Sequence, residues 1–168
     1  MKKYVIFKTK WGHFTMAGDD LGLCRTILPV ENPDISKSLL LRDFPQVRFD
    51  RNLFENLQIQ IADYFEGTRE IFSPDIRLNL DGLSVFNRKV LTTCRQIKFG
   101  QILSYSQLSE KIGSPNSGRA VGNALAKNTL PLIIPCHRVI RSDGKLGGFT
   151  GPGGTVLKKR LLQHEKGC

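Results

Sequence analysis

Residues 130–140 read LPLIIPCHRVI, so that an apolar run leads directly into the tetrad PCHR at residues 135–138. The tetrad puts a potential nucleophile, a potential base and a cation in three adjacent positions. A thiol at the end of a buried segment, beside an imidazole, is where a reactive cysteine would be built. A cysteine in an apolar run is more often a small core residue, so this stretch alone leaves both interpretations of Cys136 open.

The charge of the 168-residue chain is unevenly distributed. The formal net charge is +10, from 25 Lys and Arg against 15 Asp and Glu. Residues 79–168 contain 14 basic and 4 acidic residues, whereas residues 1–78 contain 11 of each. Such asymmetry suggests a polyanionic partner, most often nucleic acid. The alternative is a solvated basic face that maintains solubility.

The four cysteines, at positions 24, 94, 136 and 168, are widely spaced and form no CxxC or CxxxH pair. We therefore expect no structural zinc site, and we expect no cofactor. The residues after Met1 lack the apolar region of a signal peptide, and no stretch is long and apolar enough to cross a membrane. A reducing compartment with free thiols fits this pattern, and we expect a cytoplasmic protein, or a nuclear one in a eukaryote.

The pattern predicts an α+β fold in two domains, of which residues 1–78 form a small α/β domain. Short β-prone runs at 4–7, 13–17 and 21–28 predict an antiparallel sheet. Pro29 ends the third run, and Pro33 with polar residues follows it. Apolar residues at helical spacing predict a helix over residues 52–65, closed by Gly67.

Residues 79–168 are expected to form a mostly helical domain. Ser84 is placed to cap a helix through about Ile97, and the sequence from Ser104 to Gln107 matches a capping box that opens a second helix. Ser114 and Pro115 predict the start of a third helix that runs to about residue 128, and the tight turn before it suggests a helix-turn-helix. A last helix over 155–164 would turn its basic run, residues 158–160, outward.

The third of these helices is rich in small residues, at positions 118, 120, 122, 124 and 126. Glycine costs a helix about 1 kcal/mol relative to alanine, so close approach to another surface would have to offset that cost. The small residues could permit tight packing between helices, or they could let the backbone lie close to DNA. Arg119 stands among them, and it is a poor core residue but a good probe into a duplex.

Taken in order along residues 78–166, these motifs resemble the O6-alkylguanine-DNA alkyltransferases. The residues that carry the resemblance are Ser104-Tyr105, Arg119 to Gly122, Asn128, Ile134 to Ile140, Gly147 to Gly151, Lys158, Leu161-Leu162 and Glu165. The first 77 residues resemble the variable N-terminal domain of that family only weakly. Ordered motifs over about eighty positions are far more specific than the tetrad alone.

The resemblance implies a methylated-DNA–[protein]-cysteine S-methyltransferase that flips the damaged nucleotide out of duplex DNA and moves its alkyl group irreversibly to Cys136. His137 would take the thiol proton through a water, and Glu165 would orient and stabilise the imidazolium. Tyr105 would donate a proton as negative charge builds on the leaving guanine. The thioether product is inert, so each molecule would act once.

The resemblance also assigns the surfaces that meet the substrate. Arg119 would fill the gap left by the flipped nucleotide, with Ala120, Gly122 and Ser104 in the DNA contact, and the helix would lie in the minor groove. Double-stranded DNA carrying O6-alkylguanine is therefore the expected partner of a monomer. A hinge and the substrate pocket would use a further set of residues: Asn128, Pro131, Val139, Gly147, Phe149 and Thr150.

Departures from the family pattern leave alternatives to weigh. Phe149 stands where many relatives have tyrosine, and Cys24 with His13 cannot supply the four ligands of the zinc site that some relatives carry. A non-catalytic protein that only binds the alkylguanine lesion would share the basic half and the helix pair, but such relatives carry tryptophan in place of the acceptor cysteine. A cysteine hydrolase is disfavoured because adjacent Cys136 and His137 are awkward partners and no oxyanion-hole motif is visible.

Overall fold

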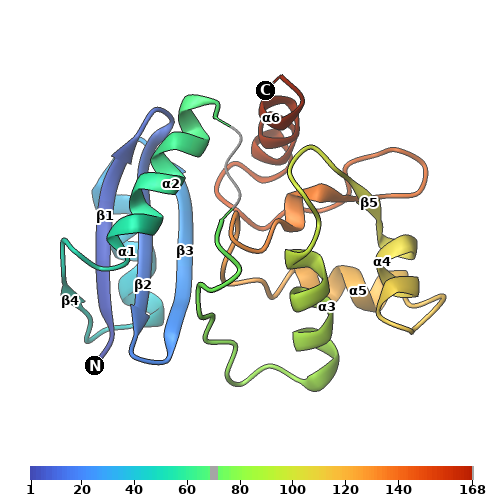
Figure 1. The fold of residues 1–168 in the computed structure, drawn as a ribbon, viewed down its shortest axis with the longest axis horizontal. Coiled ribbons are helices and arrows are strands. Elements are labelled where there is room, and N and C mark those ends of the chain that lie inside the picture. Colours follow the sequence, from blue (N-terminus) through green and yellow to red (C-terminus); the bar gives the residue numbers. More distant parts are fainter. Residues whose placement is uncertain (69–71, 168) are drawn as a thin grey trace. The chain divides into compact units, whose positions relative to one another are not determined.

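The computed structural model describes residues 1–68 and 72–167, so Cys168 lies outside the described residues. The chain divides into two compact units, an N-terminal unit from Met1 to Asn79 and a C-terminal unit from Leu80 to Cys168 (Figure 1). The expected α+β class is confirmed, because the first unit combines a sheet with helices and the second is mostly helical. Every residue of the tetrad belongs to the C-terminal unit.

A four-stranded sheet in the order β3-β2-β1-β4 forms the centre of the N-terminal unit. The strands β1 (Lys3–Thr9), β2 (Gly12–Asp19) and β3 (Gly22–Val30) run antiparallel, and the two-residue β4 (Arg48–Phe49) joins the edge of β1 in parallel. Two helices, α1 (Pro33–Asp43) and α2 (Glu55–Glu66), cover opposite faces of the sheet (Figure 1). Because both faces are covered, five consecutive residues of β2 are buried.

Helix α1 is absent from our sequence-based prediction, which assigned no element to residues 33–43. Asn32 caps this helix, since its side chain accepts a hydrogen bond from the Asp34 N–H, and Pro33 occupies the first turn. A proline at that position starts a helix rather than breaking one, because its missing N–H would have no partner there anyway. Buried Leu40 then packs against Ala17 and Ile27 of the sheet.

In the C-terminal unit, helices surround a two-stranded parallel ribbon of β5 (Leu103–Ser104) and β6 (Val139–Ile140). The helices are α3 (Val85–Arg95), α4 (Tyr105–Lys111), α5 (Gly118–Leu125) and α6 (Gly154–Lys166), together with the short 3₁₀ helix η1 (Cys136–Arg138). Ser84 caps α3, and Ser104 forms a complete capping box with Gln107 at the start of α4, as predicted. The β5–β6 pair therefore joins the start of α4 to the end of the tetrad.

Our predicted bounds for the third helix are wrong at both ends. Helix α5 begins at Gly118 after Ser117, rather than at Pro115 after a Ser114 cap, and it ends at Leu125 rather than near residue 128. Asn116, with a φ of 64°, lies in the left-handed region and bends the chain before the helix starts. The turn between α4 and α5 is therefore longer than the sequence suggested. Within the described residues, no helix is long and apolar enough to span a membrane.

Candidate functional site

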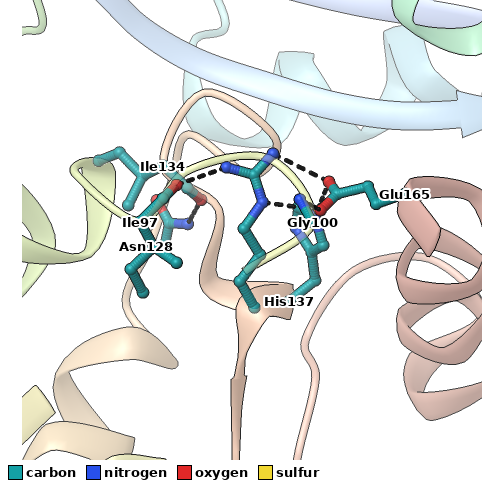
Figure 2. A network of polar contacts seen from close by, with 7 residues as sticks. Ile97, Gly100, Asn128, Ile134, His137 and Glu165 are labelled. Atoms are coloured by element: carbon teal, nitrogen blue, oxygen red, sulfur yellow. Dashed lines mark hydrogen bonds and ion pairs between the residues drawn. The ribbon is translucent and has the colours of Figure 1, made fainter. Parts of the chain in front are cut away.

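The tetrad is held in place by the apolar segment that precedes it. Leu130 and residues 132–134 are buried, and Leu132 has a φ of 78°, a strained conformation for a leucine. The buried side chain of Asn128 fixes this bend. Its Nδ2 donates to the Ile134 carbonyl at 2.9 Å (Figure 2). Its Oδ1 accepts from the Leu130 N–H at 2.9 Å. An asparagine just beyond helix α5 thus determines where the chain turns into η1.

Cys136 begins η1 with 9% of its surface exposed. Burial raises the pKa of its thiol, while the Asn128 amide and the Lys158 ammonium act in the opposite direction. The thiol is therefore protonated at neutral pH and needs a base to become a nucleophile. A second thiol, Cys94, is fully buried on α3, and burial raises its pKa further.

A buried network of charges lies directly after Cys136 (Figure 2). His137 Nε2 donates to Glu165 Oε1 at 2.7 Å, and Arg138 holds the same carboxylate with Nε to Oε2 at 2.8 Å and Nη2 to Oε1 at 2.9 Å. The third nitrogen of Arg138, Nη1, donates to the Ile97 carbonyl at 2.6 Å. The Gly100 N–H also donates to Glu165 Oε2, at 3.4 Å.

This network sets the protonation states of its members. Burial alone would raise the pKa of the Glu165 carboxyl, but hydrogen bonds from His137 and Arg138 outweigh it and hold that pKa far below its usual range. Burial lowers the pKa of His137, against the opposing pull of Glu165. His137 is therefore neutral at pH 7 with its proton on Nε2. Its Nδ1 is then an acceptor, and among the described residues it has no hydrogen-bond partner.

A cavity of about 800 Å³ opens beside Cys136. Its lining joins segments that are far apart in the sequence: Tyr105 and Ser106 from α4, Gly118, Arg119, Gly122, Leu125 and Ala126 from the α5 region, Cys136, residues 141–143, and residues 147–150. A cavity of this size is large enough to hold a small planar molecule against the thiol.

The cavity brings together many of the site residues expected from the sequence. Tyr105, Arg119 and Gly122 line it, as do Gly147, Phe149 and Thr150. Pro131 and Val139, which we expected in the pocket, are not in its lining, and Val139 is fully buried. Asn128, His137 and Glu165 are buried outside the lining. Ala120 lies exposed on α5, and Ser104 is the N-cap of α4; neither is in the lining.

Tyr105 is closely enclosed by glycines. Gly147 has a φ of 72°, and a Cβ there would lie 2.7 Å from the Tyr105 hydroxyl, so only glycine fits. Gly118 and Gly122 face the same side chain at ordinary contact distance, 3.7 Å from an added Cβ. Gly118 and Gly122 thus serve the packing of α5 against Tyr105, while Arg119 and Ala120 between them stay exposed. Burial raises the pKa of the Tyr105 phenol, so it remains a proton donor.

The comparisons with known proteins point to one family. Residues 85–167 match the model of the 6-O-methylguanine DNA methyltransferase DNA binding domain. A methylated-DNA–protein-cysteine methyltransferase of Methanosarcina acetivorans is 31% identical over 166 residues, which cover 98% of this chain and 99% of that protein. This chain belongs to the methylated-DNA–protein-cysteine methyltransferase family. The match to the rat member is closer, at 49% over 81 residues, but it covers 48% of this chain and only 38% of the rat protein.

Solved structures of the family share the fold over nearly the whole chain. The crystal structure of the Mycobacterium tuberculosis O6-methylguanine methyltransferase aligns with a TM-score of 0.77 at 30% identity, covering 99% of this chain and 94% of that one. The M. tuberculosis OGT in complex with DNA aligns with a TM-score of 0.78 at 31% identity, over 98% and 93% of the two chains. The similarity to these members of the methyltransferase family therefore includes both units.

The structure corrects our prediction for Lys158, which we expected to point outward from α6. Its side chain is buried, with 1% exposed, and Nζ donates to the Val139 carbonyl at 2.7 Å and to the Gly148 carbonyl at 3.2 Å. The same ammonium lies 3.5 Å from the Tyr105 hydroxyl. Burial lowers the pKa of Lys158, and the nearby Cys136 acts against this shift. The spacing to Leu161 and Glu165, three and seven residues later, could have revealed that Lys158 lies on the buried face.

Arg138 is the second residue whose place the sequence did not reveal. The sequence shows only a cation beside His137, whereas the structure buries Arg138, with 6% exposed, against Glu165. It is therefore unavailable to contact a phosphate. No group of three His, Cys, Asp or Glu residues within 1–68 and 72–167 is arranged to hold a metal ion.

Proposed function

We propose that this protein repairs DNA by moving the alkyl group of an O6-alkylguanine onto the sulfur of Cys136, once per molecule. Family membership supports this activity. The observation that carries the proposal is the position of Cys136, on the wall of a cavity with the His137–Glu165 pair behind it and Tyr105 beside it. A buried thiol whose base is already oriented by a carboxylate has the arrangement of an activated nucleophile.

The chemical step needs only the groups that surround the cavity. The thiol proton passes through an intervening water to Nδ1 of His137, and Glu165 stabilises the imidazolium that forms. The thiolate attacks the alkyl carbon, a C–S bond forms and the C–O6 bond breaks. The guanine leaves with the bonding electrons and takes a proton from the Tyr105 hydroxyl. Proton, electron pair and alkyl group are all accounted for without an added cofactor.

The lysine on α6 contributes charge to this step. Lys158 lies next to the Tyr105 hydroxyl, and its ammonium lowers the pKa of the Cys136 thiol. A cation there favours the thiolate before attack and the phenolate after proton donation, because both forms are anions. The charge is fixed by two backbone carbonyls, so it costs no reorganisation during the reaction.

Double-stranded DNA is the proposed partner, and it would meet the protein through the α4–α5 pair. Arg119 lies exposed on α5 at the cavity that also contains Cys136, so the same face can hold the duplex and receive a flipped nucleotide. Arg119 would replace the extruded base in the stack, and Ala120, Gly122 and Ser104 would let the backbone approach the minor groove. All of these residues come from one chain, which supports a monomer. It would act where the DNA is, in the cytoplasm or in a nucleus.

The product of the reaction provides the test. A duplex with a single O6-methylguanine, incubated with the protein, should leave one methyl group on the peptide that contains Cys136, as read by mass spectrometry. Cys136→Ser should bind the duplex and gain no methyl group. Cys94→Ser, a matched control at the other buried thiol, should still be methylated. Binding without any adduct in the wild type would reject transfer and favour a protein that only recognises the lesion, and an adduct confined to another residue would reject Cys136 as the acceptor.

A further inference from the structure

A tight turn that the proposed reaction does not use forms part of the cavity wall. Arg141, Ser142 and Asp143 line the cavity and lie in this turn. The turn is closed by hydrogen bonds from the Arg141 N–H to the Lys145 carbonyl at 2.9 Å and from the Gly144 N–H to the Arg141 carbonyl at 3.0 Å. Gly144, with a φ of 80°, supplies the left-handed residue that the reversal needs.

Asp143 fixes the Arg141 side chain to this turn. One carboxylate oxygen, Oδ2, pairs with Arg141 Nη2 at 2.9 Å, and the other, Oδ1, accepts from the Lys145 N–H at 3.0 Å. The turn is also linked to α4, since the Ser142 and Ser106 hydroxyls lie 3.3 Å apart. The guanidinium is therefore held at the same cavity whose lining includes Arg119.

The Arg141–Asp143 pair contributes little to stability. The two side chains are 56% and 42% exposed, and exposed ion pairs stabilise a protein by about 0–1 kcal/mol. Asp143 is the only partner of the Arg141 side chain in the described part of the chain. Arginine offers five N–H donors in a planar fork that matches a phosphate, so most of them remain available. A phosphate oxygen can therefore replace the carboxylate at small cost.

We propose that Arg141 binds a phosphodiester next to the damaged nucleotide, and that Asp143 holds its guanidinium ready at the cavity until DNA arrives. This inference rests on the proposed function, because it needs a nucleotide in the cavity. Arg119 and Arg141 then have different tasks on the same duplex. Arg119 occupies the stack, and Arg141 holds the backbone of the strand from which the nucleotide was extruded.

The salt dependence of binding tests the phosphate contact. Arg141→Gln should weaken binding to a lesion-containing duplex and reduce the slope of log K against log salt by about 0.9, the value for one phosphate contact. The ratio of wild-type affinity to Arg141→Gln affinity should then fall about threefold as the salt concentration is raised from about 50 to 200 mM. Lys89→Gln, which removes an exposed charge on α3 remote in sequence from the cavity lining, is the control and should keep the wild-type slope. An unchanged slope in Arg141→Gln, with a wild-type unfolding midpoint, would overturn the inference.

A neutral methylphosphonate at each linkage flanking the lesion locates the contact. One of the two substitutions should weaken binding of the wild type about as much as Arg141→Gln does, and it should not weaken binding of that variant further. Equal additional weakening in both proteins would place Arg141 elsewhere, and the inference would be wrong.

The ion pair is tested by Asp143→Asn, which keeps the Oδ1 acceptor of the turn and removes the charge. Affinity for the duplex should rise in this variant, and the gain should disappear when Arg141→Gln is also present. If the gain in affinity persists in the double variant, Asp143 does not act by holding the Arg141 guanidinium. These outcomes are separate from the proposed function, because methylation of Cys136 in the wild type is measured independently by mass spectrometry.

Discussion

The two units of this protein bury different kinds of residue. In the N-terminal unit, the buried polar side chains among the described residues are uncharged: three threonines of the sheet and Ser36 of α1. The described part of the C-terminal unit buries a histidine, an arginine, a lysine and a glutamate, together with Asn128. Burying a charge is unfavourable unless it is paired and hydrogen-bonded, so the second unit maintains its site against an energetic cost that the first unit avoids.

The difference separates a unit held together by apolar packing from a unit that also contains a network of buried, paired charges. The sheet of the N-terminal unit is stabilised by apolar and aromatic packing, for example between Phe14, Phe65 and Trp11. Apolar residues of similar volume can replace one another in such a core. A single substitution in the network around Glu165 has a different effect, because it leaves the charge of a buried partner unpaired.

The largest expected effect therefore comes from Glu165→Gln. Loss of the carboxylate leaves Arg138 buried without its counter-ion and His137 without its orienting partner. The free energy of unfolding should fall by about 3–5 kcal/mol. Single-turnover transfer from a methylated duplex should slow by about 10²- to 10⁴-fold, because His137 is no longer oriented and its imidazolium form is no longer stabilised. Urea denaturation and quenched single-turnover assays measure the two quantities.

Leu40→Ala in the N-terminal unit is the matched control for that variant. Leu40 is fully buried, so its truncation should also cost about 2–5 kcal/mol, while the transfer rate of the folded protein stays at the wild-type value. If both variants lose transfer equally, or if Glu165→Gln keeps its stability, the contrast between the units does not hold.

A smaller effect on stability and a clear effect on chemistry are expected for Lys158→Met. Methionine is similar in length, so packing survives while the ammonium and its bonds to two carbonyls are lost. Because the Lys158 cation lowers the pKa of Cys136, its removal should raise that pKa. Transfer at neutral pH should slow by about tenfold, and the profile of rate against pH should move to higher pH. A slower rate without any movement of the profile would assign Lys158 to packing alone.

The sequence was sufficient for much of the fold because local signals and tertiary structure agree there. The strand runs before Pro29 and the serine caps of α3 and α4 were predicted from composition and capping rules, and the structure has them. Helix α1 was not predicted, because Pro33 has opposite meanings at a helix start and in a connection. Local rules cannot decide between these without the sheet that buries Leu40.

The candidate site was predictable where the resemblance supplied it, and less so where side-chain direction mattered. The resemblance named Cys136, His137 and Glu165, and the structure brings His137 and Glu165 to 2.7 Å. The burial of Lys158 and the pairing of Arg138 with the Glu165 carboxylate both depend on which face of α6 is buried. The run of three basic residues at 158–160 does not indicate that face. Arg141 reaches the cavity through a turn whose position is set by contacts distant in sequence.

The smallest expected effect is the dependence of stability on pH between 7 and 5. Burial lowers the pKa of His137, so as the pH falls from 7 the unfolded chain takes up a proton on this residue before the folded protein does. The free energy of unfolding should therefore fall as the pH falls through about 6.5, with a slope of at most about 1.4 kcal/mol per pH unit. The ion-paired Asp19 and Asp50 of the N-terminal unit, like Glu165, have lowered pKa values, so their contributions to stability are lost only below about pH 4.3.

His137→Gln retains an N–H that can donate to Glu165 and lacks the titrating group, so it should flatten the slope between pH 7 and 5. Chemical denaturation at several pH values measures it, and an equal slope in wild type and variant would mean that His137 is not held neutral by the C-terminal unit.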